Sequence, residues 1–255
     1  MKIATWNVNS IRTRLERVIP WLEQHAPDVL LMQETKVEDE KFPVADLEAA
    51  GYRVAFHGQK TYNGVAICAR EPIADVRLGF GDGGDDSQAR FIAGTVRGVR
   101  VMSAYVPNGK AVGHDDYQFK LAWLGRLRRY LDANAASTDE LVLAGDFNVA
   151  RDDRDVHDPA AWEGENLASE PERRAVDNVL AWGLCDAFRE LQPEPGFYSW
   201  WDYRMLGFAK NRGLRIDYAF ITPPVRERLV HASIDRNARK GNKPSDHAPV
   251  IIELV

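Results

Sequence analysis

Short apolar runs rich in valine, isoleucine and aromatic residues recur from one end of the chain to the other, and glycine, proline, asparagine and aspartate separate them. Compact apolar runs bounded by turn-forming residues are typical of β-strands. We therefore expect nine strands, at residues 2–6, 28–33, 52–57, 64–69, 90–96, 99–106, 140–145, 215–221 and 249–254.

Helical patterns are fewer and longer than the strand patterns. Apolar residues recur at helical spacing in residues 10–26, 115–133 and 172–182. Ser10 is a candidate N-cap for the first of these helices, and Gly183 is a candidate stop for the third. Many strands with a few covering helices favour sheets packed on each other with helices outside, an α+β arrangement.

No segment has the composition of a linker, so we expect residues 1–255 to form a single domain. The glycine- and aspartate-rich stretch at 79–88 is short enough to be a loop between strands. The segments IATWNVN (3–9) and VLAGDFNV (142–149) suggest an internal duplication, because each runs from an apolar strand into an asparagine-bearing turn. If two halves pack back to back, these two turns would meet at one edge of the sandwich.

Composition narrows the class of protein. The 255 residues are 45% hydrophobic, which is enough for a well-buried core. No apolar run approaches the ~18 residues needed to cross a bilayer, and no signal pattern follows Met1, so we expect a cytoplasmic protein with no membrane partner. Cys68 and Cys185 lie far apart in apolar stretches and are expected to be reduced thiols.

The formal net charge of −5 is unevenly distributed along the chain. Residues 204–243 carry ten Lys or Arg against three acids, and residues 1–17 carry four against one. A chain polarised in this way can present a basic face to a polyanion despite its negative net charge. Solvated surface charges without a partner would explain the same counts.

Several of the expected strands end on side chains that can bind a metal ion or a phosphate group. Any one of them could be a simple turn former or cap. Together, their carboxylate and amide oxygens suit a hard cation such as Mg²⁺ better than zinc, which would require more histidine or cysteine. The set comprises Asn7, Asn9, Glu34, Tyr105, Asn108, Asp146, Asn148, Asp217, Asp246 and His247.

These residues are accompanied by no nucleophilic serine or cysteine elbow and by no glycine-rich phosphate loop. Metal-assisted attack of water on phosphorus is then the natural reaction, with the cation neutralising charge on the phosphoryl oxygens. Asp246 and His247 lie between Pro244 and Pro249, on a stiff turn that would hold both side chains still. A histidine needs an acidic partner to fix its tautomer, and Asp217 is available.

Seven motifs follow one another along the chain: WNVNSIR (6–12), LLMQETK (30–36), YVPNG (105–109), GDFNVA (145–150), YSWWDYR (198–204), NRGLRIDY (211–218) and PSDHAPV (244–250). Together they resemble the exonuclease III family of abasic-site endonucleases, within the group that also holds DNase I and inositol-polyphosphate phosphatases. The resemblance runs from end to end and is closest to the compact bacterial branch. It implies a DNase I-like α/β fold, a four-layered sandwich of two packed mixed β-sheets flanked by helices.

The resemblance also implies a magnesium-dependent hydrolase that cuts DNA on the 5′ side of abasic sites, with 3′-to-5′ exonuclease and 3′-phosphatase activity. Glu34 would be the principal Mg²⁺ ligand, with Asn7 and Asp246 nearby, and Mn²⁺ is a plausible substitute. Asp146 and Asn148 would belong to the same metal-binding set. Whether one metal ion acts or two stays open.

Residues of the same motifs would act on the reacting phosphate. Asp146 would orient or deprotonate the attacking water, and Asn148 would hold that water or a phosphoryl oxygen. His247, buttressed by Asp217, and Tyr105 would contact the scissile phosphate. Whether His247 or Asp146 is the general base stays open.

The segment SWW followed by NRGLRID resembles the abasic-pocket segment of the DNA-repair branch. Trp200, Leu214 and Ile216 would wall a small apolar slot for a flipped-out sugar that lacks its base, whereas Trp201 is expected in the core. The expected partner is double-stranded DNA with abasic sites or blocked 3′ ends, bound by a monomer. Outside the slot, the side chains expected to contact DNA are Asn108, Arg204, Lys210, Arg212 and Lys243.

Two rival functions remain for the same fold. A phosphatase acting on a small or lipid phosphate is disfavoured by the SWW and GLRID segments. An inactive or weakly active nucleic-acid-binding regulator would have lost a metal-binding or catalytic residue, and the expected ones are all present. The insert 151–171 varies among relatives, so contacts of His157 and Asn166 with DNA stay open, as does the effect of loop 109–116 on the balance of activities.

Overall fold

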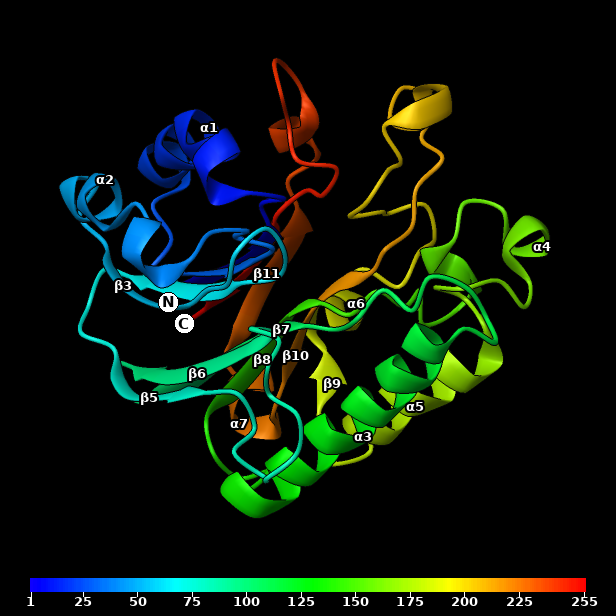
Figure 1. Ribbon diagram of the computed structural model, residues 1–255, viewed down its shortest axis with the longest axis horizontal. Helices are drawn as coiled ribbons and strands as arrows, with labels where there is room; N and C mark the ends of the chain where they lie inside the picture. Colours follow the sequence, from blue (N-terminus) through cyan, green and yellow to red (C-terminus); the bar gives the residue numbers. More distant parts are fainter.

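Two six-stranded mixed β-sheets form the centre of the computed structural model, which describes all residues from 1 to 255 (Figure 1). Each sheet contains one parallel pair, β1 with β2 and β7 with β8, and its other pairs are antiparallel. The first sheet has the order β11 (Leu229–Ile234), β12 (Val250–Leu254), β1 (Lys2–Asn7), β2 (Val29–Gln33), β4 (Val65–Ala69) and β3 (Arg53–His57). The second has the order β5 (Ala74–Leu78), β6 (Phe91–Val96), β7 (Val99–Tyr105), β8 (Leu141–Asp146), β10 (Asp217–Ile221) and β9 (Cys185–Asp186).

Helices cover the outer faces of both sheets, so the molecule has four layers, as the sequence predicts (Figure 1). Helices α1 (Ile11–His25) and α2 (Val44–Ala49) pack on the first sheet, and α3 (Asp115–Asn134) and α5 (Glu170–Leu180) pack on the second. The short helices are α4 (Pro159–Trp162), α6 (Ala187–Leu191) and α7 (Pro223–Arg226). No helix combines the length and the apolar character that a bilayer-crossing segment needs.

The central strands are apolar on both faces because each sheet is buried on both sides. In β2, Val29 and Leu31 point into the core between the sheets, and Leu30 and Met32 point into the core beneath α1. Successive side chains of a strand alternate between its two faces, so a strand covered on both sides becomes a continuous apolar run. This is why the central strands are the easiest elements to predict from the sequence.

The two turns that resemble each other in sequence meet at one edge of the sandwich, as predicted. Strand β1 ends at Asn7 and strand β8 ends at Asp146, and the Asn7 amide Nδ2 donates to Asp146 Oδ2 at 2.9 Å. Gly145 makes the second turn possible, because its φ is +151° and an added Cβ would lie 1.9 Å from the Ala104 carbonyl oxygen. The polar ends of strands from both sheets therefore lie together.

Candidate active site at the edge of the two sheets

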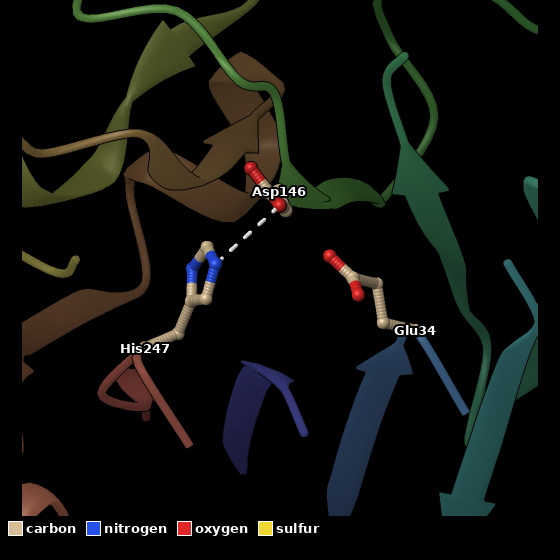
Figure 2. Close-up of side chains that lie close together, drawn as sticks. All are labelled: Glu34, Asp146 and His247. Atoms are coloured by element: carbon tan, nitrogen blue, oxygen red, sulfur yellow. Dashed lines mark ion pairs between the residues drawn. The ribbon is translucent and has the colours of Figure 1, made fainter. Parts of the chain in front are cut away.

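Three side chains from separate turns converge where the two sheets meet (Figure 2). Glu34 follows β2, Asp146 ends β8, and His247 lies in the turn before β12. One ligand atom from each residue lies within 4.8 Å of the others. Figure 2 shows the Glu34 carboxylate and the His247 ring both directed toward Asp146. Residues more than 200 positions apart in the sequence thus form one compact polar cluster.

The Glu34 carboxylate is held by three donors. Its Oε1 accepts hydrogen bonds from Asn7 Nδ2 at 3.0 Å and from the Tyr105 hydroxyl at 2.8 Å, and its Oε2 pairs with Lys36 Nζ at 2.7 Å. Burial acts to raise the pKa of Glu34, but the Lys36 charge and the Asn7 hydrogen bond outweigh it and lower the pKa below its usual value. Glu34 is therefore ionised and fixed in direction.

Asp146 is fully buried beside other acids. Its Oδ2 accepts from Asn7 at 2.9 Å and from Asn148 Nδ2 at 3.2 Å, and its Oδ1 accepts from the Asn148 backbone N–H at 2.9 Å. Burial raises the pKa of Asp146 to about 7, and the charges of Asp217 and Glu34 act in the same direction, while His247 opposes them. The carboxylate therefore lies where additional positive charge would be favourable.

His247 is oriented by Asp217 on one side and faces Asp146 on the other. Its Nδ1 lies 2.9 Å from Asp217 Oδ2, and its Nε2 lies 3.8 Å from Asp146 Oδ2. Burial acts to lower the pKa of His247, but the Asp217 and Asp146 carboxylates outweigh it and raise the pKa to about 10. The Ser199 hydroxyl donates to Asp217 at 2.6 Å, so the partner of the imidazole is itself held in place.

The chemistry of this cluster fits a hard divalent cation. Four carboxylates, Glu34, Asp146, Asp217 and Asp246, lie in or beside it, against the side chains of Lys36 and His247. The oxygen atoms of Glu34 and Asp146 belong to the close cluster, and carboxylate oxygens are the donors that Mg²⁺ prefers. A bound cation would offset the repulsion between these buried acids.

Asp246 and Asn7, both expected near the metal ion, are hydrogen-bonded to neighbouring protein groups. Asp246 accepts from Asn9 Nδ2 at 2.9 Å and from the Trp200 indole N–H at 3.0 Å, and it lies outside the close cluster. Asn7 donates its Nδ2 to both Glu34 and Asp146. Its Oδ1 accepts instead from the Asn9 backbone N–H at 3.0 Å. In this arrangement Asn7 bridges the carboxylates as a donor.

Left-handed backbone conformations occur in and beside the cluster, and at twelve other non-glycine residues of the chain. Glu34, Lys36, Asn9 and Asn148 all have left-handed backbones, with φ between 45° and 52°. Such conformations cost about 1–3 kcal/mol each and persist where the surrounding structure enforces them, most often at functional sites.

Asn108 and Asn148 are joined at the rim of the cluster. Asn108 Nδ2 donates to Asn148 Oδ1 at 3.2 Å, and Asn166 of the 151–171 insert donates to the Asn108 carbonyl at 3.0 Å. Beneath them, the buried Lys120 ammonium donates to the carbonyls of Asn148 at 2.6 Å and Asn108 at 3.1 Å, and it pairs with the buried Glu172. The buried ion pair of Lys120 and Glu172 thus anchors the two turns that carry Asn108 and Asn148.

Replacing Lys120 with methionine should lower the free energy of unfolding by about 3–5 kcal/mol, because it leaves Glu172 charged and buried without a partner. Chemical denaturation of Lys120→Met, Glu172→Gln and the double variant measures the effect. The double variant should lose less than the sum of the two single changes. Lys41→Met, at an exposed pair with Glu38, is the matched control and should change little. Strictly additive losses would contradict the pairing.

The three residues expected to wall an apolar slot lie in one cluster, but two of them are fully buried. Leu214 and Ile216 are 0% and 1% exposed, and Trp200 is half-buried against them. The Trp200 backbone pairs with Leu214 through two hydrogen bonds of 2.9 and 3.0 Å. Trp201 is buried in a separate cluster, as expected. Leu167 belongs to the same apolar cluster as Leu214 and Ile216, and no sequence pattern predicts it there.

The basic residues divide into internal and exposed groups. Arg14 and Arg17 donate to backbone carbonyls between residues 238 and 244, and Arg215 is buried between Asp155 and Asp186. These arginines hold the loop before His247 and the 151–171 insert in place, so they are not free to bind a polyanion. Arg204 is exposed but paired with Asp202. The exposed cations without a carboxylate partner in this region include Lys210, Arg212, Lys240 and Lys243.

Sequence reasoning missed four residues that position the cluster. Lys36 pairs with Glu34, Ser199 orients Asp217, Ser245 accepts from the His247 backbone N–H at 3.2 Å, and Lys120 anchors the asparagine turns. Lys36 and Ser245 had a local signal, since Lys36 lies two positions after Glu34 in QETK and Ser245 lies two positions before His247 in PSDHAPV. Ser199 and Lys120 act through contacts between distant segments, which no local pattern reveals.

Comparison with known proteins agrees with this geometry. The Endonuclease/Exonuclease/phosphatase family model matches residues 4–247. Exodeoxyribonuclease III of Haemophilus influenzae is 34% identical to this chain, with 100% of both chains covered.

Two solved structures share the fold throughout. The 3′ phosphatase NExo from Neisseria, bound to a product DNA hairpin, is 41% identical with a TM-score of 0.97, covering 100% of this chain and 99% of that chain. An AP endonuclease from Archaeoglobus fulgidus is 42% identical with a TM-score of 0.96 and the same coverage. The chain therefore belongs to the endonuclease/exonuclease/phosphatase family, and within it to the exonuclease III branch.

Proposed function

We propose that this chain is a magnesium-dependent DNA-repair phosphodiesterase that cuts 5′ to abasic sites and also acts on 3′ ends as a 3′-to-5′ exonuclease and 3′-phosphatase. The observation that carries the proposal is the convergence of Glu34, Asp146 and His247 within 4.8 Å, with His247 fixed by Asp217. The names of its relatives, an exodeoxyribonuclease III, a 3′ phosphatase and an AP endonuclease, support all three activities.

Glu34 and Asp146 would hold the Mg²⁺ ion through their carboxylate oxygens, and Asn7 would keep the two carboxylates at a fixed separation. When bound, the ion would neutralise charge that develops on the phosphoryl oxygens during hydrolysis. Asp246 would support the metal site from outside the close cluster, where it accepts hydrogen bonds from Asn9 and Trp200. Mn²⁺ is expected to substitute for Mg²⁺, because both accept oxygen ligands in octahedral geometry.

Asp146 would take a proton from the attacking water, and the hydrogen bonds from Asn7 and Asn148 that orient it support this role. His247 would donate a hydrogen bond from its Nε2 to a phosphoryl oxygen, because Asp217 holds its Nδ1 and its Nε2 faces Asp146. Tyr105, which donates to Glu34, borders the same space and would contact the phosphate. Charge-assisted donors preorganised in this way stabilise a developing negative charge.

DNA would lie across the edge of the sandwich where these turns meet. Trp200, which is partly exposed, would face an abasic sugar, and the buried Leu214 and Ile216 would support it from beneath. Every residue with an assigned role lies in one chain, so we expect a monomer of residues 1–255 to be active as one domain. Exposed side chains would bind the rest of the duplex, namely Asn108, Arg204, Lys210, Arg212 and Lys243.

Chelation of the metal should abolish cleavage. Three duplexes test this: one with a single tetrahydrofuran abasic mimic, one with a 3′-phosphate at a nick, and one intact, each with Mg²⁺, with Mn²⁺ and with EDTA. We expect cleavage of the first two substrates with either metal and none with EDTA. Equal cleavage in EDTA would contradict the metal site.

The same assay separates the rival functions. Hydrolysis of small phosphate esters without any action on the duplexes would indicate a phosphatase of the same family. Tight binding of the duplexes without cleavage under any metal would indicate a regulator that uses the fold only to bind nucleic acid.

A further inference from the structure

Lys120 is a buried cation beside the candidate active site, and the hydrolytic mechanism proposed above does not use it. It lies in the first half of α3 and is 0% exposed, so its side chain cannot contact DNA. A lysine is almost never fully buried unless its ammonium group is paired and hydrogen-bonded, because removing an unpaired charge from water is costly. The groups that hold the ammonium therefore indicate what the residue does.

All three protons of the Lys120 ammonium have acceptors. Its Nζ donates to the Asn148 carbonyl at 2.6 Å, to the Asn108 carbonyl at 3.1 Å and to the Glu172 carboxylate. An ammonium group has three donors and no acceptor, so no donor is left over. The bond to Glu172 forms the ion pair, and the other two bonds hold the backbones of Asn108 and Asn148.

Glu172 is itself fixed by several donors. Its Oε1 also accepts from the Leu167 N–H at 3.1 Å, and its Oε2 accepts from the Ser169 N–H at 3.1 Å and from the Ser169 hydroxyl. The Ser169 hydroxyl in turn lies 2.7 Å from the Tyr117 hydroxyl of α3. The carboxylate thus joins the start of α5 to α3, and it gives the ammonium a rigid support.

The carbonyl of Asn148 belongs to a residue whose side chain contacts Asp146. Asn148 Nδ2 donates to Asp146 Oδ2 at 3.2 Å and to the Val106 carbonyl at 3.0 Å, and its Oδ1 accepts from Asn108 Nδ2 at 3.2 Å. The Asn148 backbone is left-handed, with a φ of 50°, so contacts with the surrounding structure must maintain it. A shift of this backbone would move a donor that orients the Asp146 carboxylate.

We propose that Lys120 is a positioning residue for the hydrolytic step: from within the core it fixes the backbone of Asn148, and through the Asn148 side chain it fixes Asp146. The inference rests on the proposed function, since it concerns the group that would take the proton from water. Without the ammonium, the carbonyls of Asn108 and Asn148 lose their common donor. A displacement of about 1 Å near a reacting group can lower the rate by about 100-fold.

Lys120→Met tests the role, because it removes the ammonium and keeps most of the length of the side chain. With Mg²⁺ and the tetrahydrofuran duplex, kcat should fall by about 10- to 100-fold. KM, and the affinity for the duplex measured in EDTA, should stay close to those of the unchanged chain, because the residue is buried. A loss in kcat alone is typical of an interaction that acts in the transition state.

A double variant separates positioning from stability. Lys120→Met combined with Glu172→Gln removes both buried charges, so it should melt at a higher temperature than Lys120→Met alone. Its kcat should nevertheless stay low, because the two carbonyls still lack a donor.

Leu131→Ala is the matched control for a loss of stability in the same helix. Leu131 is buried in the core beneath α3, about 16 Å further along the helix from Lys120. Its replacement should lower the melting temperature and leave kcat unchanged. All rates are measured at a temperature at which circular dichroism shows each variant to be folded.

Low kcat in both Lys120 variants, with normal KM and a normal control, would support the proposal. Recovery of kcat in the double variant would overturn it, and so would an equal fall in Leu131→Ala, because stability alone would then explain the loss. A loss confined to KM or to DNA affinity would overturn it as well. Failure of the unchanged chain to cut the tetrahydrofuran duplex with Mg²⁺ would instead contradict the proposed function.

Discussion

Replacing His247 with alanine is expected to slow cleavage of abasic-site DNA by about 100- to 1,000-fold, the usual loss when one preorganised donor to a developing oxyanion is removed. His247 is buried, its Nδ1 is held by Asp217 at 2.9 Å, and its Nε2 faces Asp146. The imidazole is therefore fixed before the substrate arrives. Single-turnover rates with saturating enzyme measure the loss in the chemical step.

The affinity for DNA should change much less than the rate, because His247 contacts one phosphate among many. His231→Ala, at an exposed histidine on β11, is the matched control and should retain the full rate. Rescue of His247→Ala to near the normal rate by added imidazole would support a role for the ring itself. A loss below about threefold would contradict the assigned role, since it is far under the range for such a donor.

Glu34→Ala should reduce Mg²⁺-stimulated cleavage to the level seen in EDTA. The carboxylate is one of the two acids in the close cluster, so its removal leaves Asp146 as the single carboxylate there to bind the cation. Glu34→Gln keeps the shape and the hydrogen bond from Tyr105, so a similar loss in that variant would assign the effect to the charge. The cleavage rate of each variant, measured as a function of Mg²⁺ concentration, gives the size of this loss.

The fold should survive this change. Its removal relieves the repulsion of Asp146 but also removes the ion pair with Lys36 and the hydrogen bonds from Asn7 and Tyr105. We expect these opposing effects to leave only a small change in the melting temperature. Glu40→Ala, at an exposed acid of the same segment, is the control. Full Mg²⁺-dependent activity in Glu34→Ala would refute its role as a ligand.

The strands were predictable where both of their faces are buried. All nine expected strands are present. Eight of them are buried along nearly their whole length, which requires apolar runs such as Val29–Gln33, and the ninth, the edge strand β3, is partly exposed. Three further strands were missed for physical reasons. Strand β5 is exposed along its whole length at a sheet edge, β9 has two residues, and β11 is a partly exposed edge strand with an irregular register. Their sequences carry little of the pattern that burial produces.

The helices show the same division between strong and weak local signals. The helix expected at 172–182 is at Glu170–Leu180, because Pro171 is accepted in the first turn and the Glu172 carboxylate accepts from the Ser169 backbone N–H. The second helix begins at Asp115 and is capped by the His114 side chain, a residue seldom considered as a cap. Four short helices, α2, α4, α6 and α7, have six residues or fewer, too few to show a periodic pattern.

The meeting of the two asparagine-bearing turns could be predicted because each follows a recognisable buried strand. Two of the partners that fix the cluster could not be predicted, since Ser199 and Lys120 reach it from distant segments. The charge counts also overstated the basic surface. Arg215 and Arg239 are buried, and a residue count cannot distinguish a structural arginine from one that is free to bind phosphate.

The central claim is that Glu34 and Asp146 bind a divalent cation beside His247. Crystals of the protein soaked in Mn²⁺ test it most directly through the anomalous scattering of the metal. We predict one strong anomalous peak within about 2.0–2.4 Å of a Glu34 oxygen, lying between the Glu34 and Asp146 carboxylates, and its loss in Glu34→Gln. Mn²⁺ bound only elsewhere on the molecule, with Glu34 still paired to Lys36, would contradict the account.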